Sequence, residues 1–562
     1  MKKKSEETSK LSGRSSTLSI RLMNKGASVK DGLRSGHTMI ERESEGGYLY
    51  TAQSEDAPPS WVKIVREFSI EDLPDLTNRH CSAVLFLEVT PSDLRMSKRF
   101  FAITFGSGHL FLNPDSYVKN FGLRVTLNAV ARSDLRNVDV AQLDTTLIQK
   151  RIQASRKSDL RDFGIDEQSD LLRLAGGAPT DREFARALVG KDALSLTAKI
   201  DPAKIAEKCR EAFDLYCEKH YERDFKFIDY IVPENRQSVV KVLDKKVFDS
   251  LKSMVDGRSS SLHIAIPEMI NPEDAFEIGY YGSGLRSGSK ATYPDVEIED
   301  YVSELRSGRM ADIADMSELK ASHEIRVIVN GEGDKRQRQR LYDCFIFEAK
   351  YGGATYVLFA GSWYRIDSGY YARVVLNFEK YLSKKPFVKS TNSVNERDFI
   401  GELNARKELL NLDQVKLSPL NASGANLEPC DFFSKSRQFI HLKDGHDSAP
   451  ISHLWNQGLV SAECLVSDGE FRQQLRDNVQ IRQIKYGRAG FVKLLPRKGD
   501  QPVTASYSVV YGIMRTAYVS KKARSKGLDL PFFSKVSFQP IAERIGRMGF
   551  KVEVHLIEKK RK

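Results

Sequence analysis

One stretch of the chain, residues 395–466, constrains the fold most because its hydrophobic period changes in a fixed order. Residues 395–408 carry apolar side chains at helical spacing, short strand-like runs follow, and residues 448–466 return to helical spacing. Two of the runs, 427–433 and 437–443, are joined by the short turn Ser-Lys-Ser, which is typical of a β-hairpin. With a further strand just before the hairpin, the sequence predicts the order helix, strand, strand, strand, helix.

Residues able to do chemistry lie at the ends of these predicted strands. Asp431 is on the second strand and Lys443 on the third, and His441 shares a strand face with Lys443 because strand side chains alternate. A carboxylate there can bind Mg²⁺ or Mn²⁺, and a lysine can stabilise charge that develops on a phosphodiester. We therefore expect catalytic roles for Asp431, His441, Lys443 and Gln457, and metal binding by Asp431, Glu402 and His441.

The element order and these residues resemble the core of the PD-(D/E)XK nucleases. Such cores place an Asp on the second strand and a carboxylate-x-Lys pair on the third, so the resemblance implies a restriction-endonuclease-like α-β-β-β-α unit. His441 departs from the pattern because it stands where the carboxylate is expected, and histidine suits Mn²⁺ better than Mg²⁺. The alternative interpretation is a turn-side carboxylate at Asp431, a solvated strand end at Lys443, and surface or packed histidines that bind no metal.

A second carboxylate-x-Lys pair, Glu348 and Lys350, lies in the stretch FIFEAKYGG. A further apolar strand pattern follows it where a nuclease core has a helix, and no acidic partner precedes it. A β-hairpin with a Gly-Gly turn describes this stretch better.

Charge favours a polyanionic partner, since 87 Lys and Arg outnumber 75 Asp and Glu and the formal net charge is +12. Residues 481–499 interleave aromatic side chains with cations, a combination that suits base stacking and phosphate contact, although a solvated loop is the plainer alternative. The expected nucleic-acid contacts are Arg482, Lys485, Tyr486, Arg488, Lys493 and Lys535.

Length and pattern predict a multidomain protein of the mixed α+β class, because 562 residues exceed what one core normally contains. Strands are expected over 82–89, 99–106 and 121–130, and an amphipathic helix over 201–221. The predicted parts are a basic, disordered arm (1–36), a β-rich domain (37–195), a mixed α/β domain (196–386) and the nuclease-like domain with a basic extension (387–562).

Several other classes are not expected. No apolar run reaches the length of a membrane helix, and the basic start lacks the apolar stretch of a secretory signal. The six cysteines form no CxxC pair, so we expect free thiols in a reducing cytoplasm. Phosphate-binding loops of the GxxxxGK[ST] type, GxSxG elbows and HExxH helices are absent from the sequence.

Five separated segments, among them FGLRVTLN and HLKDGHDSAPISHLWNQG, resemble in order a sporadically distributed, uncharacterised bacterial family over residues 20–556. Members of that family occur on mobile elements and near anti-phage defence genes, so the resemblance implies a cytoplasmic defence protein. Together with the core pattern it predicts a metal-dependent endonuclease. The alternatives are a catalytically inactive nucleic-acid-binding sensor or effector, and a scaffold that recognises a phage protein. DNA is favoured over RNA as the partner, with a defence-system subunit or a second copy as further partners.

Overall fold

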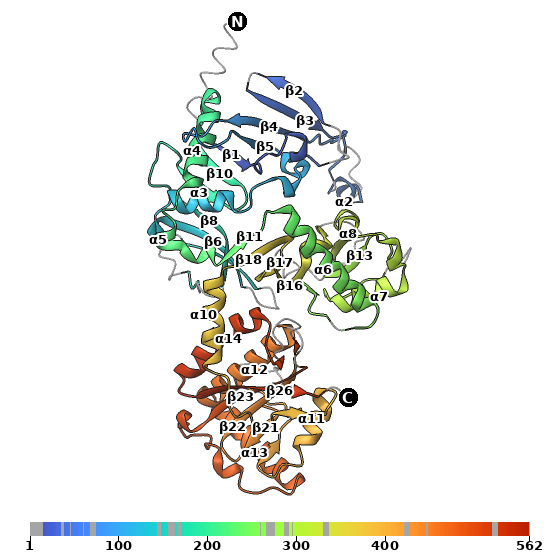
Figure 1. Ribbon diagram of the computed structural model, residues 1–562, viewed down its shortest axis with the longest axis vertical. Helices are drawn as coiled ribbons and strands as arrows, with labels where there is room; N and C mark the ends of the chain where they lie inside the picture. Colours follow the sequence, from blue (N-terminus) through green and yellow to red (C-terminus); the bar gives the residue numbers. More distant parts are fainter. Residues whose placement is uncertain are drawn as a thin grey trace. The chain divides into compact units, whose positions relative to one another are not determined.

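The computed structural model describes most of the chain, and Figure 1 shows its elements. The described residues are 15–34, 39–44, 46–59, 61–67, 75–142, 148–154, 163–165, 170–258, 260–265, 276–285, 291–294, 296–329, 337–420, 427–445, 448–516, 518–519 and 526–560. The chain divides into two compact units, residues 1–141 with 149–229, and residues 142–148 with 230–562. The mixed α+β, multidomain expectation is confirmed by these units and their several sheets.

The first unit is built on a sheet of ten strands in the order β2-β3-β4-β5-β1-β10-β9-β8-β6-β7. The strands are β1 (Ser15–Leu22), β2 (Ile40–Ser44), β3 (Gly47–Gln53), β4 (Cys81–Val89), β5 (Arg99–Phe105), β6 (Leu135–Gln142), β7 (Ile148–Gln153), β8 (Asp170–Gly177), β9 (Ala187–Gly190) and β10 (Leu194–Lys199). The strands expected over 82–89 and 99–106 are confirmed as β4 and β5. The prediction of a disordered arm is wrong for residues 15–34, because β1 pairs with β10 and β5 inside the sheet, and residues 1–14 lie outside the described residues.

The strand predicted over 121–130 is a helix, α3 (Phe121–Ala129). Its apolar residues suit a strand locally, but most of them are buried, and tertiary packing overrides their β propensity. The approach is close at one point, where a Cβ on Gly190 would lie 1.9 Å from the carbonyl oxygen of Gly122. A glycine pair at this contact lets the helix backbone touch the sheet backbone.

The helix predicted over 201–221 is α4 (Ile205–Cys217), and it belongs to the first unit. Its Phe213 packs edge-on against Phe101 of β5, with ring centroids 6.2 Å apart. The compact unit therefore ends at residue 229, whereas the sequence predicted a domain boundary at 195/196, because α4 contributes its apolar face to the first unit's core.

The second unit begins with two smaller sheets, with strand orders β11-β18-β17-β16-β12 and β13-β14-β15. Their strands are β11 (Ile231–Pro233), β12 (His263–Ile264), β13 (Phe276–Tyr281), β14 (Glu324–Val329), β15 (Gln337–Arg340), β16 (Phe345–Tyr351), β17 (Ala354–Phe359) and β18 (Ser362–Ile366). Three helices pack with them, α6 (Gln237–Val255), α7 (Ile298–Ser307) and α8 (Met316–Ser322), and α10 (Ser368–Glu379) follows β18.

A six-stranded mixed sheet occupies the rest of the second unit, in the order β19-β26-β23-β22-β21-β20. Its strands are β19 (Ser390–Thr391), β20 (Leu409–Asn411), β21 (Phe432–Ser434), β22 (Gln438–Asp444), β23 (Ser508–Thr516) and β26 (Lys551–Lys559). Its helices are α11 (Glu396–Leu403), α12 (Ser448–Ser467), α13 (Gly469–Lys485) and α14 (Phe532–Arg547). Strands β20, β21 and β22 are antiparallel, whereas β22, β23 and β26 are parallel. The predicted order α-β-β-β-α is confirmed as α11-β20-β21-β22-α12.

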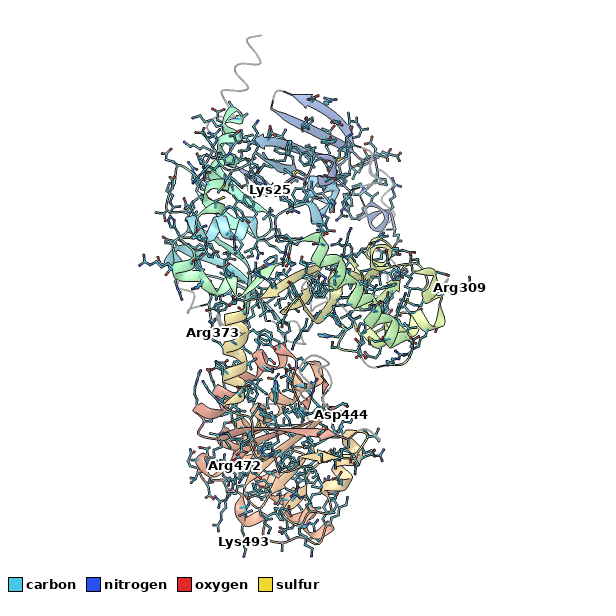
Figure 2. The ribbon with its side chains drawn as sticks, in the orientation of Figure 1. Lys25, Arg309, Arg373, Asp444, Arg472 and Lys493 are labelled. Carbon is cyan, nitrogen blue, oxygen red and sulfur yellow. The ribbon has the colours of Figure 1, made fainter. Side chains whose placement is uncertain are left out.

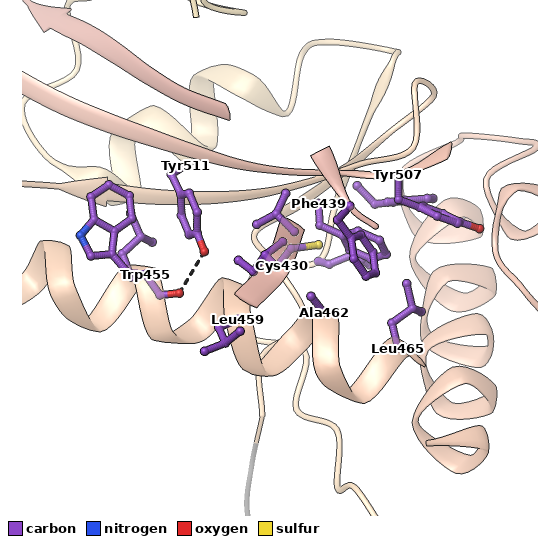
Figure 3. Close-up of a cluster of buried hydrophobic side chains, with 14 of the residues drawn as sticks. Cys430, Phe439, Trp455, Leu459, Ala462, Leu465, Tyr507 and Tyr511 are labelled. Carbon is purple, nitrogen blue, oxygen red and sulfur yellow. Dashed lines mark hydrogen bonds between the residues drawn. The ribbon is translucent and has the colours of Figure 1, made fainter. Parts of the chain in front are cut away.

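Helices cover both faces of this sheet. On one face, Phe399 and Leu403 of α11 pack against Ile440 and Leu442 of β22. On the other, α12 and α14 bury a larger cluster in which the Tyr511 hydroxyl donates a hydrogen bond to the carbonyl of Trp455, at 2.9 Å (Figure 3). Because both faces are covered, the strand ends are where the side chains of this sheet can meet solvent.

Candidate active site at the ends of strands β20 and β22

The hydrogen-bond register brings three chain segments together at one end of the six-stranded sheet. The amide of Leu412, just after β20, donates to the carbonyl of Asp431 at 2.8 Å, and the amide of Asp431 donates to the carbonyl of Ile440 at 3.0 Å. Antiparallel pairing therefore places the end of β20 and the end of β22 beside the start of β21. Polar residues that follow or precede these strands share one location.

Lys443 forms an ion pair with Glu396 at this end of the sheet. Its Nζ lies 3.2 Å from one carboxylate oxygen of Glu396, and the amide of Asp444 donates to the same oxygen at 3.2 Å. Glu396 is the first residue of α11, which the side chain of Asn395 caps by accepting the amide hydrogen of Asp398. The cap begins the helix beside β22 and so brings Glu396 to the lysine.

Three further carboxyl groups lie at the same end of the sheet as this ion pair. Asp413 follows β20, and Glu428 and Asp431 precede β21. Burial raises the pKa of Asp431 to about 8, with further increases from the charges of Glu396, Asp413 and Glu428. The amide of Leu442, which donates to Oδ2 at 2.6 Å, lowers the pKa but does not offset burial. We call Glu396, Asp413, Glu428 and Asp431 the acidic cluster.

Cations partly balance the acidic cluster. Burial raises the pKa of Asp413, and Glu396 raises it further, while the guanidinium of Arg482 lowers it. Burial also raises the pKa of Glu428, and the ammonium groups of Lys416 and Lys443 lower it. Enzyme active sites often place desolvated carboxyl groups of like charge beside a lysine, because this arrangement shifts the pKa values of the catalytic groups.

The structure brings Asp431 and Lys443 to the same end of the sheet, but it places His441 elsewhere. His441 is 2% exposed, and its ring lies 5.9 Å from that of Tyr511, its partner in the β22–β23 register. Burial lowers its pKa to about 3, and its Nε2 is buried with no hydrogen-bond partner among the described residues. Strand alternation directs His441 into the face that α12 covers, and its imidazole is buried there in the core of the sheet.

Glu402, like His441, lies outside the acidic cluster. It is exposed near the end of α11, and its Oε2 accepts hydrogen bonds from Thr391 and Ser393 at 2.5 and 3.0 Å. Within the described parts of the chain, no three His, Cys, Asp or Glu side chains form a group that could hold a metal ion. The predicted ligand set Asp431, Glu402 and His441 is therefore not assembled, and Gln457 is half-buried on α12.

The residues predicted to contact nucleic acid have different environments. Arg482 donates to the carbonyl of Asp413 at 2.9 Å, and Arg488 donates to the carbonyl of Asn404 at 2.6 Å. Lys535 is buried at 3% exposure and pairs with Asp529 at 2.6 Å, so it is not a surface cation. The remaining three are Lys485 and Lys493, which are exposed, and Tyr486, which is half-buried. Figure 2 shows Lys493 well apart from Asp444 at the end of β22.

In the second carboxylate-x-Lys pair, the carboxylate bonds to the start of a helix. Glu348 on β16 accepts the amide hydrogen of Phe532, the first residue of α14, at 2.9 Å. Burial raises its pKa, and this amide lowers it. The expected hairpin is confirmed, because β16 pairs antiparallel with β17 across Gly352 and Gly353.

Sequence reasoning missed Glu396 and Asp413. A local signal for Glu396 is its position directly after the capping residue Asn395, where carboxylates are favoured by the helix dipole. A signal for Asp413 appears only in the structure, where the next residue, Gln414, has a φ of 60°. Non-glycine residues with positive φ gather at functional sites.

The fold and this site define a mixed α+β, multidomain protein with an acidic cluster and a lysine at one sheet end. The chain belongs to the family of unknown function DUF6119, whose model matches residues 18–558. The expected membership of a family without a known function, over nearly the whole chain, is thereby confirmed. No match was found among the curated proteins or among the solved structures. Of the helices in the described residues, none has the length and apolar character needed to cross a membrane.

Proposed function

We propose that the protein is a metal-dependent nuclease that hydrolyses phosphodiester bonds, with a restriction-endonuclease-like core formed by α11, β20–β22, α12 and β23. One observation carries the proposal. Lys443 at the end of β22 is ion-paired with Glu396, and the other three carboxyl groups of the acidic cluster lie around this pair. A lysine among desolvated carboxyl groups at a strand end suits the hydrolysis of a phosphate ester.

The proposed cofactor is Mg²⁺ or Mn²⁺, and carboxylate oxygens are ligands of the chemical type that these ions take. Mg²⁺ needs only one or two protein carboxylates, because waters and substrate phosphate complete its shell. Asp431 and one neighbouring carboxyl group, that of Asp413 or of Glu428, would hold the ion. Burial is the main cause of the raised pKa values of these groups. When bound, a divalent cation polarises the phosphodiester and lowers the pKa of an attacking water.

The chain's own groups have separable roles in this proposal. The Lys443 ammonium stabilises negative charge on the phosphate oxygens as it develops. Glu396 orients that ammonium and, through the amide of Asp444, fixes the end of the strand that carries it. The Asp431 carboxyl group is held in place by the Leu442 amide.

The proposed substrate is nucleic acid, with DNA favoured over RNA, and the proposed setting is anti-phage defence in the bacterial cytoplasm. The net charge of +12 supports a polyanionic substrate. The proposed defence role is supported by the family resemblance. The proposed protein partners are a subunit of a defence system and a second copy of this chain.

The test is cleavage of plasmid DNA and of RNA with Mg²⁺, with Mn²⁺ and with EDTA. Wild-type protein should cleave only with a divalent cation, and Lys443→Ala should lower the rate by about two to three orders of magnitude. Lys551→Ala is the matched control, because Lys551 is an exposed lysine at the first residue of β26 in the same sheet. Equal rates for Lys443→Ala and wild type would remove the proposed site.

The second candidate is a nucleic-acid-binding sensor or effector without catalysis. Two observations favour it, the burial of His441 where nuclease cores have a carboxylate and the lack of a ready metal-binding group among the described residues. This candidate predicts salt-dependent binding of nucleic acid with no cleavage under either metal.

A further inference from the structure

Helix α13 contacts the segment 413–420 through side chains that bond only to its main chain. The Arg482 guanidinium donates to the carbonyl of Asp413 at 2.9 Å. Gln474 makes a reciprocal pair with Ser418, accepting its amide hydrogen at 3.0 Å and donating to its carbonyl at 3.0 Å. The Asp468 carboxylate accepts the amide hydrogen of Leu420 at 2.7 Å.

These contacts form a ladder in which the helix and the segment run in opposite directions. From the N-cap of the helix to its last turn, residues 468, 474 and 482 bond to residues 420, 418 and 413 of the segment, respectively. Asp468 is also the N-cap of α13, since its other carboxylate oxygen accepts the amide hydrogen of Phe471 at 3.0 Å. The start of the helix and the end of the segment are therefore fixed by the same side chain.

The segment needs this support because little regular structure holds it. It begins after β20 ends at Asn411, and among the described residues one isolated bridge joins it to Leu427, through Leu417. Gln414 has a φ of 60°, a conformation that costs a non-glycine residue free energy and persists only when its surroundings enforce it. Main-chain hydrogen bonds from a long helix can enforce it, because the helix itself packs into the core through Phe471, Leu475 and Val479.

The same segment carries two charged groups of the candidate active site, the carboxylate of Asp413 and the ammonium of Lys416. We propose that Arg482 and Gln474 are positioning residues that hold the main chain of 413–418 so that Asp413 and Lys416 keep their places at the acidic cluster. Arg482, expected from the sequence to contact nucleic acid, acts in this proposal through Asp413. The inference rests on the proposed function for its effect on activity, but its effect on the segment is independent of that function.

The experiment compares matched variants of α13 in the full chain. Arg482→Met removes the contact to Asp413, and Arg476→Met is its control, because Arg476 donates to the carbonyls of Val492 and Leu495 at 2.9 and 2.6 Å. Gln474→Leu is compared with Gln473→Leu, whose amide bonds to Asp477 on the same helix. Hydrogen exchange of residues 412–420 and the Mn²⁺ concentration for half-maximal plasmid cleavage are measured for each.

Arg482→Met should speed exchange in 412–420 by about fivefold, the effect of losing one hydrogen bond. Gln474→Leu should speed it by at least as much, because that variant loses two hydrogen bonds to Ser418. Both variants should raise the required Mn²⁺ concentration by about tenfold, as loss of outer-shell support commonly does. The control variants Arg476→Met and Gln473→Leu should change neither the exchange rate of 412–420 nor the required Mn²⁺ concentration. Exchange no faster than in the controls overturns the inference, and faster exchange with an unchanged Mn²⁺ requirement reduces the ladder to a structural role.

Two comparisons keep the inference and the proposed function apart. If wild-type protein does not cleave nucleic acid, the proposed nuclease function fails, and exchange still decides whether the ladder holds the segment. Arg482→Lys retains a hydrogen-bond donor and should restore part of the protection from exchange. If Arg482→Met does not fold, Arg482→Lys must show an exchange rate between those of wild type and Gln474→Leu. An exchange rate equal to that of wild type in Arg482→Lys would overturn the role of the guanidinium.

Discussion

The ammonium of Lys443 lies 3.2 Å from the carboxylate of Glu396. This ion pair joins the C-terminal end of β22 to the first residue of α11. The two side chains are 33% and 31% exposed, so solvent screens the pair. Such pairs contribute at most about 1 kcal/mol to stability. The position of the pair within the acidic cluster therefore matters more for chemistry than for the free energy of unfolding.

Replacing Glu396 should separate these two effects. Glu396→Gln should lower the cleavage rate by at least about tenfold, because the Lys443 ammonium loses its orienting charge, while the thermal midpoint changes little. Asp398→Asn is the control, since Asp398 is an exposed carboxylate in the same helical turn. Parallel cleavage and melting measurements decide the matter, and equal loss of activity in both variants would contradict the assigned role.

Stability should fall as pH rises because of Asp431. Its folded pKa of about 8 exceeds the ordinary value of 3.8, so the folded state holds a proton that the unfolded state releases. The stabilisation is complete below about pH 4 and is lost as pH rises toward about 8, with a slope of about 1.4 kcal/mol per pH unit from this one group. Asp431→Asn should remove that slope. Urea unfolding between pH 5 and 9, without divalent cations, would show parallel curves for both proteins if the assignment is wrong.

His441 should contribute a pH dependence of the opposite sign. Its folded pKa of about 3 lies below the ordinary 6.5, so its contribution is present above about pH 6.5 and is lost as pH falls toward 3. His441→Leu should keep cleavage activity and lessen the loss of stability in acid, because the buried Nε2 has no partner to lose.

His441→Glu should destabilise the protein by several kcal/mol, since it places a carboxyl group beside Tyr511 in the core. The sequence pattern predicts instead that this change restores a preference for Mg²⁺. A folded His441→Glu protein that cleaves better with Mg²⁺ than wild type would refute the core assignment.

Nucleic-acid binding should depend on the exposed lysines of the 481–499 stretch. Replacing Lys485 and Lys493 together with Ala should weaken binding at 50 mM salt and lower the slope of log affinity against log salt by up to about two. Lys535→Ala is the comparison, because that lysine is buried and paired with Asp529 and should leave the slope unchanged. Salt titrations by fluorescence anisotropy measure both, and a slope that does not change in the double variant would locate the binding surface elsewhere.

Local pattern was sufficient to predict the element order of residues 395–466 and the placement of Asp431 and Lys443 at the same end of the sheet. Both follow from short-range rules, the alternation of strand side chains and the tight turn between β21 and β22, which set the register of a hairpin without reference to the rest of the chain. The mixed α+β class followed in the same way from the change of hydrophobic period.

Tertiary packing decided which other groups join them. Glu396 and Glu402 lie on the same helix, about 9 Å apart along its axis, and only the contact of Phe399 and Leu403 with β22 selects the first of them for the lysine. His441 is buried because α12 covers its face of the sheet, a fact that strand alternation alone does not contain. Asp413 reaches the acidic cluster through antiparallel pairing and through Arg482, which is 69 residues away in sequence. Local propensity carries no information on contacts at that separation, so only the folded chain determines them.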